Sequence, residues 1–117
     1  MKKKIYFNFI FNTNKKEKVE LFIDKEIRPY IEVSEIISFN QYWKDEAMYT
    51  FEFNSIINSN GKEIIFDVLK KVSLFSNHWQ VSYNLESDEC FDFSGVCSND
   101  IKYSIIHFIS YSLEEEA

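Results

Sequence analysis

Glycine, proline and cysteine are scarce in this chain of 117 residues, which has two Gly, one Pro and two Cys. Few glycines leave few places where the backbone could approach a phosphate or cofactor closely, and no Gly-rich nucleotide-binding motif is present. The cysteines, Cys90 and Cys97, are too few for the disulfide framework of a small secreted domain. We therefore expect a cytoplasmic protein that carries no cofactor.

Long hydrophobic runs are also missing, because no window approaches the roughly 20 apolar residues that cross a bilayer. The basic N-terminus, residues 1–4, looks like the start of a signal peptide, but Asn8 and Asn12 interrupt the apolar stretch behind it. Neither secretion nor membrane association is expected. The length predicts one domain, residues 1–117.

Charge is divided unevenly along the chain, whose formal net charge is −6. Residues 1–33 hold eight Lys or Arg against five Asp or Glu, whereas residues 34–117 hold five against fourteen. The segment 72–117 alone contains eight acids and one base, Lys102. Such a segment repels nucleic acids, which bind through basic stripes, and attracts basic partners such as the active-site face of a nuclease. Solubility alone is the other explanation of the acidity.

Hydrophobic periodicity predicts an α+β fold, since a period of two recurs in six segments and helical spacing in two. The predicted order is β-α-β-β-α-β-β-β, a two-layer sandwich with both helices on one face of a largely antiparallel sheet. Each helix is expected to begin at a capping box, Asn14 with Glu17 and Asn60 with Glu63. Residues 99–113 fit a strand better than a helix, because β-branched and aromatic residues dominate, but a helix stays open.

No pattern of catalytic residues stands out. Cys97, Asp100 and His107 come nearest to a Cys-His-Asp combination, but no strained nucleophile turn accompanies them. Zinc could use Cys90, Cys97, His78 and His107, although their spacing is not that of a zinc site, and no metal is expected. A small hydrolase that uses His107 or Cys97 is therefore the alternative function.

Two groups of residues are candidates for protein binding. Tyr42 and Trp43 adjoin acids at the end of a predicted hairpin, and neighbouring strand residues point to opposite faces, so one large aromatic should lie away from the helices. Aromatic anchors ringed by charge are typical of binding hot spots. The other group is an acidic edge in the C-terminal third. The candidate residues are Glu86, Asp88, Glu89, Asp92 and Asp100 of the acidic edge, and Tyr42, Trp43, Asp45 and Glu46 of the hairpin.

In overall character the chain resembles the small immunity proteins of bacterial contact-dependent inhibition and polymorphic toxin systems. The resemblance covers a short acidic α+β domain rich in Asn and Lys, with Trp79 in a strand, a hairpin over 90–95, and a last apolar strand from Ile105 into Leu113 and three Glu residues. It transfers no binding residue to a position here. It implies an inhibitor, not an enzyme, that covers the active site of a cognate toxin, expected to be a nuclease with a basic substrate channel. The oligomeric state stays open.

Overall fold

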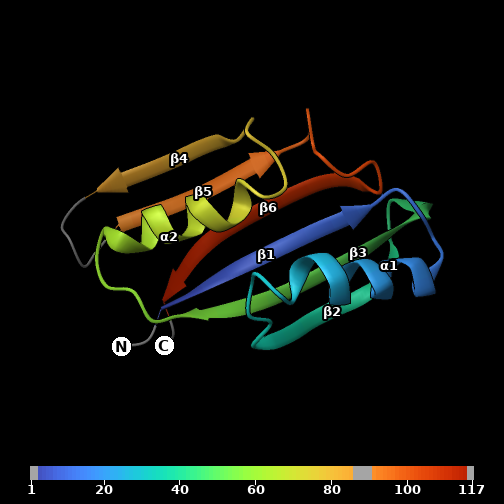
Figure 1. Cartoon of the computed structure of the whole chain (residues 1–117), viewed down its shortest axis with the longest axis horizontal. Coiled ribbons are helices and arrows are strands. Elements are labelled where there is room, and N and C mark those ends of the chain that lie inside the picture. Colours follow the sequence, from blue (N-terminus) through green and yellow to red (C-terminus); the bar gives the residue numbers. More distant parts are fainter. Residues whose placement is uncertain (1–2, 86–90, 116–117) are drawn as a thin grey trace.

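The computed structural model describes residues 3–85 and 91–115, which form a mixed arrangement of strands and helices (Figure 1). The predicted α+β class is confirmed in that six antiparallel strands and two helices are present. No helix in this part of the chain is long and apolar enough to cross a membrane. The elements are β1 (Lys3–Phe11), α1 (Lys16–Phe22) continued by a π-helix, η1 (Ile23–Ile27), β2 (Glu35–Tyr42), β3 (Asp45–Ile57), α2 (Glu63–Val72), β4 (Gln80–Leu85), β5 (Phe91–Cys97) and β6 (Ile106–Glu115).

All six strands form one sheet in the order β2-β3-β1-β6-β5-β4. β1 is central and pairs along its length with β3 on one side and β6 on the other. The three strands β2, β3 and β1 come from the N-terminal half of the chain, and the three strands β6, β5 and β4 come from the C-terminal half (Figure 1). The acidic stretch that begins at residue 34 therefore supplies β2 and β3 as well as β4, β5 and β6, and segment 72–117 supplies the three strands of the C-terminal half.

The hydrophobic core lies against one face of β1, whose alternate residues are buried. Phe11 of β1 packs edge-on against Phe22 of α1, with ring centroids 5.6 Å apart. Phe9, on the same face of β1, packs edge-on against Phe75, which follows α2, at 5.3 Å. The helices lie in front of the sheet in Figure 1, and their buried side chains join these rings in one cluster. Each buried aromatic contributes roughly 1.5–3 kcal/mol through its burial.

Neither predicted capping box forms, because α1 begins at Lys16 and α2 at Glu63 without a side-chain cap on either helix. Before α1, the hydroxyl oxygen of Thr13 accepts a hydrogen bond from the N–H of Lys15 at 3.2 Å. Before α2, the backbone carbonyl of Asn60 accepts from the N–H of Glu63 at 3.2 Å. Hydrogen bonds within the turns that precede the helices are therefore present in place of the predicted capping boxes.

The first helix changes pitch before it ends. The N–H of Arg28 donates to the carbonyl of Ile23 at 2.9 Å, five residues back, which defines the π-helix. The helix ends before Pro29, as Pro requires. Helical spacing along the sequence places Tyr30 on the same face as Ile23 and Ile27, but Tyr30 is exposed and Ile31 is buried instead.

A bulge in β6 changes which residues face the core. Phe11 of β1 pairs with Ile106, while the preceding Ile10 pairs with Phe108, so His107 is an extra residue between them. Ile106 is buried and His107 is exposed. Every second residue from Ile101 to Leu113 has the same strand parity in the sequence, but the bulge turns His107 to solvent.

Candidate functional site

The C-terminal half of the sheet carries exposed acids with little basic compensation. Asp92 lies on β5 and Asp100 follows it, and both are exposed. The single base of segment 72–117, Lys102, places its Nζ 3.0 Å from the backbone carbonyl of Ser73, next to the end of α2. This contact holds the ammonium group at the end of α2, which leaves the acids of β5 without a lysine from their own half of the sheet.

The acids predicted as one edge do not form one cluster. Glu86, Asp88 and Glu89 lie outside the described residues. Asp92 is at the start of β5, opposite Asn84 of β4, whereas Asp100 comes after the strand has ended. At about 3.3 Å per strand residue, the two carboxylates belong to opposite ends of a strand about 20 Å long. The described part of the acidic edge is therefore spread along β5.

The hairpin between β2 and β3 brings the other predicted residues together. Tyr42 pairs with Asp45, so Trp43 and Lys44 form the turn, earlier than the polar stretch expected to turn. Trp43 is 82% exposed, and the centroid of its ring lies 6.1 Å from that of Tyr42. The Nζ of Lys44 lies 4.9 Å from the centroid of the Trp43 ring. Glu46 is exposed on the next strand. This aromatic tip adjoins the β2 edge of the sheet, on the far side from the acids of β5.

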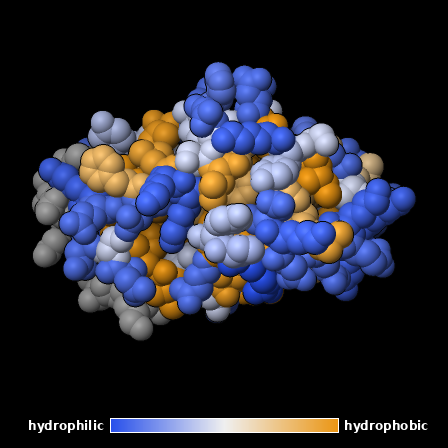
Figure 2. All heavy atoms as spheres, in the orientation of Figure 1, coloured by the Kyte–Doolittle hydropathy of each residue, from blue (hydrophilic) through white to orange (hydrophobic). Residues whose placement is uncertain are grey.

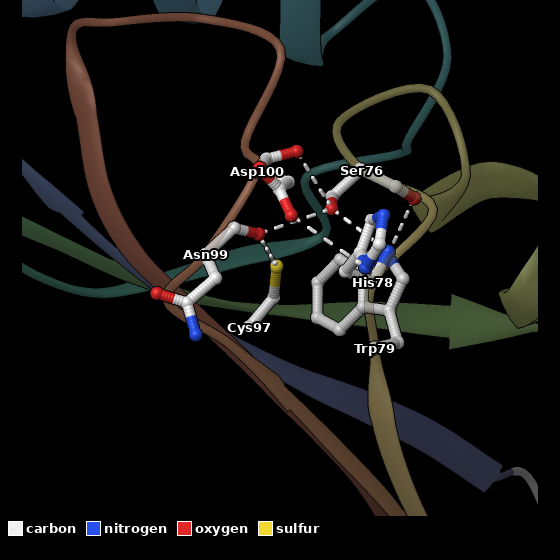
Figure 3. A network of polar contacts seen from close by, with 6 residues as sticks. All are labelled: Ser76, His78, Trp79, Cys97, Asn99 and Asp100. Carbon is white, nitrogen blue, oxygen red and sulfur yellow. Dashed lines mark hydrogen bonds and ion pairs between the residues drawn. The ribbon is translucent and has the colours of Figure 1, made fainter.

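A polar network that the sequence reasoning missed lies where the chain enters β4 (Figure 3). The Nδ1 of His78 is 3.6 Å from a carboxylate oxygen of Asp100. The hydroxyl of Ser76 donates to the backbone carbonyl of Asp100 and accepts from the backbone N–H of His78, both at 3.0 Å. Next to this network, β4 and the loop after β5 line a cavity of about 320 Å³. The network ties the loop after β5 to the start of β4.

Cys97 and His107, the residues considered for catalysis, are not brought together. Cys97 is buried, and its thiol donates to the backbone carbonyl of Asn99 at 3.3 Å. Among the contacts of the described residues, none joins Cys97 to His107 or to His78. In the same part of the chain, no three His, Cys, Asp or Glu side chains gather as metal ligands would.

The groups with displaced pKa values in the described part of the chain are three tyrosines: Tyr6 and Tyr111 of the sheet, and Tyr103 before β6, whose pKa is raised first by its hydrogen bond to Glu26. Burial raises the pKa of Tyr111 to about 12. Its hydroxyl oxygen is buried without a hydrogen-bond partner in the described part of the chain. Burial, followed by a hydrogen bond to Glu52, raises the pKa of Tyr6. Desolvation thus keeps both phenols neutral, which suits a packing role rather than acid-base chemistry.

β4 exposes side chains that its periodicity assigned to the core. Val81 and Tyr83 alternate with polar residues, yet they are 37% and 61% exposed. The strand Gln-Val-Ser-Tyr-Asn-Leu contains no charged residue, Pro or Gly. Such a strand is unusual at the edge of a sheet, where natural proteins place residues that prevent pairing.

Comparisons with family models, with curated proteins and with solved structures found no match.

Proposed function

We propose that this chain is an immunity protein that binds a cognate toxin, a nuclease, and covers its basic active-site cleft with an acidic surface. The observation that carries the proposal is the acidic excess of segment 72–117, which supplies β4, β5 and β6. Segment 72–117 has eight acids and one base, and that base, Lys102, is held against the end of α2. A basic cleft is attracted to a segment with such an acidic excess.

A binding role also fits the exposed side chains better than the catalytic alternative does. Trp43 and Tyr83 are large aromatics that remain mostly in solvent, and such residues act as anchors in protein interfaces. Cys97 and His107, in contrast, lie apart, and the thiol is directed to a backbone carbonyl. The hydrolase alternative has no observation of comparable weight in its favour.

The test uses the C-terminal domain of the protein encoded by the reading frame immediately upstream. That domain is expressed in bacteria with and without this chain, and growth and complex formation are measured. The proposal expects the domain to arrest growth alone, and expects the chain to restore growth and to co-purify with it at a one-to-one ratio. Continued arrest, or a domain that is harmless by itself, would contradict the proposal.

A further inference from the structure

The two edges of the sheet differ in how well they are guarded against pairing with another strand. β4 pairs with β5 in an unbroken register from Gln80 to Leu85, and the side chains from Gln80 to Asn84 are all exposed. It contains no charge, Pro, Gly or bulge. β2 begins with Glu35, and its pairing with β3 shifts register twice. Charges and bulges are the usual protection of an edge, so β4 is the edge left open.

The open edge is held in place before any partner arrives. The indole N–H of Trp79, the residue before β4, donates to the carbonyls of Ser76 and Val72 at 2.9 and 3.2 Å. Its ring also packs against Tyr111 of β6, with centroids 5.4 Å apart. These contacts fix the entry to β4 on the rest of the domain. A strand that is already fixed loses little conformational freedom when another strand pairs with it.

One face of β4 offers apolar contacts to an added strand. Val81 and Tyr83 lie on the same side of β4. Val81 pairs with Gly95 of β5, and this side of the sheet is the one that faces the core. Figure 2 shows hydrophobic atoms at the surface over β4 and beside α2, interrupted by hydrophilic side chains. An added strand would place alternate side chains next to Val81 and Tyr83, so those side chains should be apolar.

The charge around β4 decides between a second copy of the chain and a different protein. If β4 paired with β4 of a second copy, the β4 and β5 strands of the two copies would lie side by side, and residues 80–97 hold four acids and no base. Like charges in such an arrangement are destabilising. Lys70 and Lys71 lie nearby in the last turn of α2, but they do not offset this excess. A basic strand added beside β4, in contrast, would be attracted to Asp92, which pairs with Asn84 from the other side of β4.

We infer that an extended basic segment of the partner protein adds to β4 as a further strand of the sheet, with apolar and basic side chains alternating along it. The inference rests on the proposed function for the identity of the partner, the toxin domain. Main-chain hydrogen bonds to β4 provide the pairing, Val81 and Tyr83 contact the apolar side chains, and Asp92 of β5 attracts the basic ones.

The first experiment does not need the toxin. The ¹⁵N-labelled chain is titrated with a peptide as long as β4 in which Lys and Val alternate, and amide resonances are followed by NMR. We expect shifts centred on β4. Two further peptides carry N-methyl groups on one or the other alternate set of residues. Only one alternate set points its N–H groups at β4, so one methylated peptide should bind like the parent and the other should lose at least about tenfold in affinity.

Several outcomes would overturn the inference. Shifts centred on β2 or absent from β4, equal binding of both methylated peptides, or equal binding of a peptide with Glu in place of Lys would each do so. A concentration-dependent dimer with protected β4 amides, seen by light scattering and hydrogen exchange, would make a second copy the occupant.

A second experiment separates this inference from the proposed function. Tyr83→Lys places a charge on the open edge, and Ile37→Lys, on an exposed residue of β2, is the matched control. Tyr83→Lys should weaken the toxin complex by about tenfold or more while Ile37→Lys leaves it unchanged, with circular dichroism as the check on folding. If both variants bind the toxin as well as the wild type, the function stands and the β4 site is wrong. If the peptide adds to β4 but the chain neutralises no toxin, the site stands and the function is wrong.

Discussion

The two edge strands of this sheet, β2 and β4, differ in the regularity of their pairing and in the side chains that they expose. β2 ends in a tight hairpin, is interrupted by register shifts and packs Phe39 edge-on against Tyr49 and Phe51 of its neighbour, at 4.9 and 5.8 Å. β4 has a regular register, and exposed Val81 and Tyr83 where β2 has a partly buried Phe39. The contrast teaches that an apolar pattern of period two identifies a strand but not its burial. Burial depends on whether a helix lies over that strand.

Removing the support of β4 should have the largest effect. Trp79→Ala deletes a half-buried ring and both of its hydrogen bonds to carbonyls at the end of α2, so the free energy of unfolding should fall by about 3 kcal/mol. Trp79→Phe keeps a ring and should cost about 1 kcal/mol. Urea unfolding measures both values. Equal losses for the two variants would show that the ring contributes nothing beyond the hydrogen bonds.

The contact between β5 and β6 provides the next test, because it has no counterpart near β2. Gly95 pairs with Tyr111, and a Cβ on Gly95 would lie 2.4 Å from the Cζ atom of the tyrosine ring. Gly95→Ala should therefore destabilise the domain by about 1–3 kcal/mol through overpacking. In the Tyr111→Leu background the same change should cost less, since the ring is gone. Thermal unfolding of the four proteins in this cycle checks the prediction, which fails if the cost is the same in both backgrounds.

A charge reversal on each half of the sheet compares them as binding surfaces. Asp92→Lys should lower the association rate with the toxin domain by about tenfold at low salt, and by less at physiological salt. Glu46→Lys, an equally exposed change beside the hairpin, should change the rate by less than about twofold. Asp100 needs Asn rather than Lys, because its φ of 55° lies in the left-handed region that Asn tolerates. Surface-binding kinetics at two ionic strengths give the rates; a larger effect at Glu46 would move the interface to the hairpin.

The smallest expected effect concerns the hydroxyl of Tyr111. Tyr111→Phe removes a buried oxygen without a partner, so stability at pH 7 should rise by about 1 kcal/mol. Unfolded tyrosine has a pKa near 10, and burial raises the folded value to about 12. The stabilisation by the neutral phenol is complete below pH 10 and is lost as the pH rises towards 12. The variant should therefore lose less stability than the wild type between pH 10 and 12, as measured by urea unfolding at each pH. A parallel loss in both proteins would contradict this assignment.

The sequence predicted the strands and helices well because their periods are carried by large aromatics and β-branched residues. The prediction failed where one additional residue shifts the alternation of buried and exposed positions along a strand. His107 is an extra residue in β6, and a bulge depends on the partner strand, which periodicity within one segment does not report. The capping boxes failed because other contacts form at the helix starts: Thr13 accepts from the N–H of Lys15, and the N–H of Glu63 donates to the backbone carbonyl of Asn60 instead of its side chain.

The candidate site was predicted only in part. The composition showed where acids accumulate, and adjacency showed that Tyr42 or Trp43 must be exposed. The proximity of His78 to Asp100, and the position of β4 at an edge, depend on the order of strands in the sheet. Strand order joins segments far apart in the chain, so neither feature has a local signal.

The π-helix after α1 also bears on how relatives of this chain should be aligned. Its hydrogen bond from Arg28 to Ile23 encloses one residue more than an α-helical turn does. Removing one residue there, such as the exposed Lys25, would restore regular α-helical spacing while Phe22 and the residues before it kept their places. A chain one residue shorter between Ile23 and Arg28 is therefore expected to keep the fold, with a regular α-helical turn in place of the π-helix. An alignment that forbids a gap at this position would shift the downstream buried residues out of register.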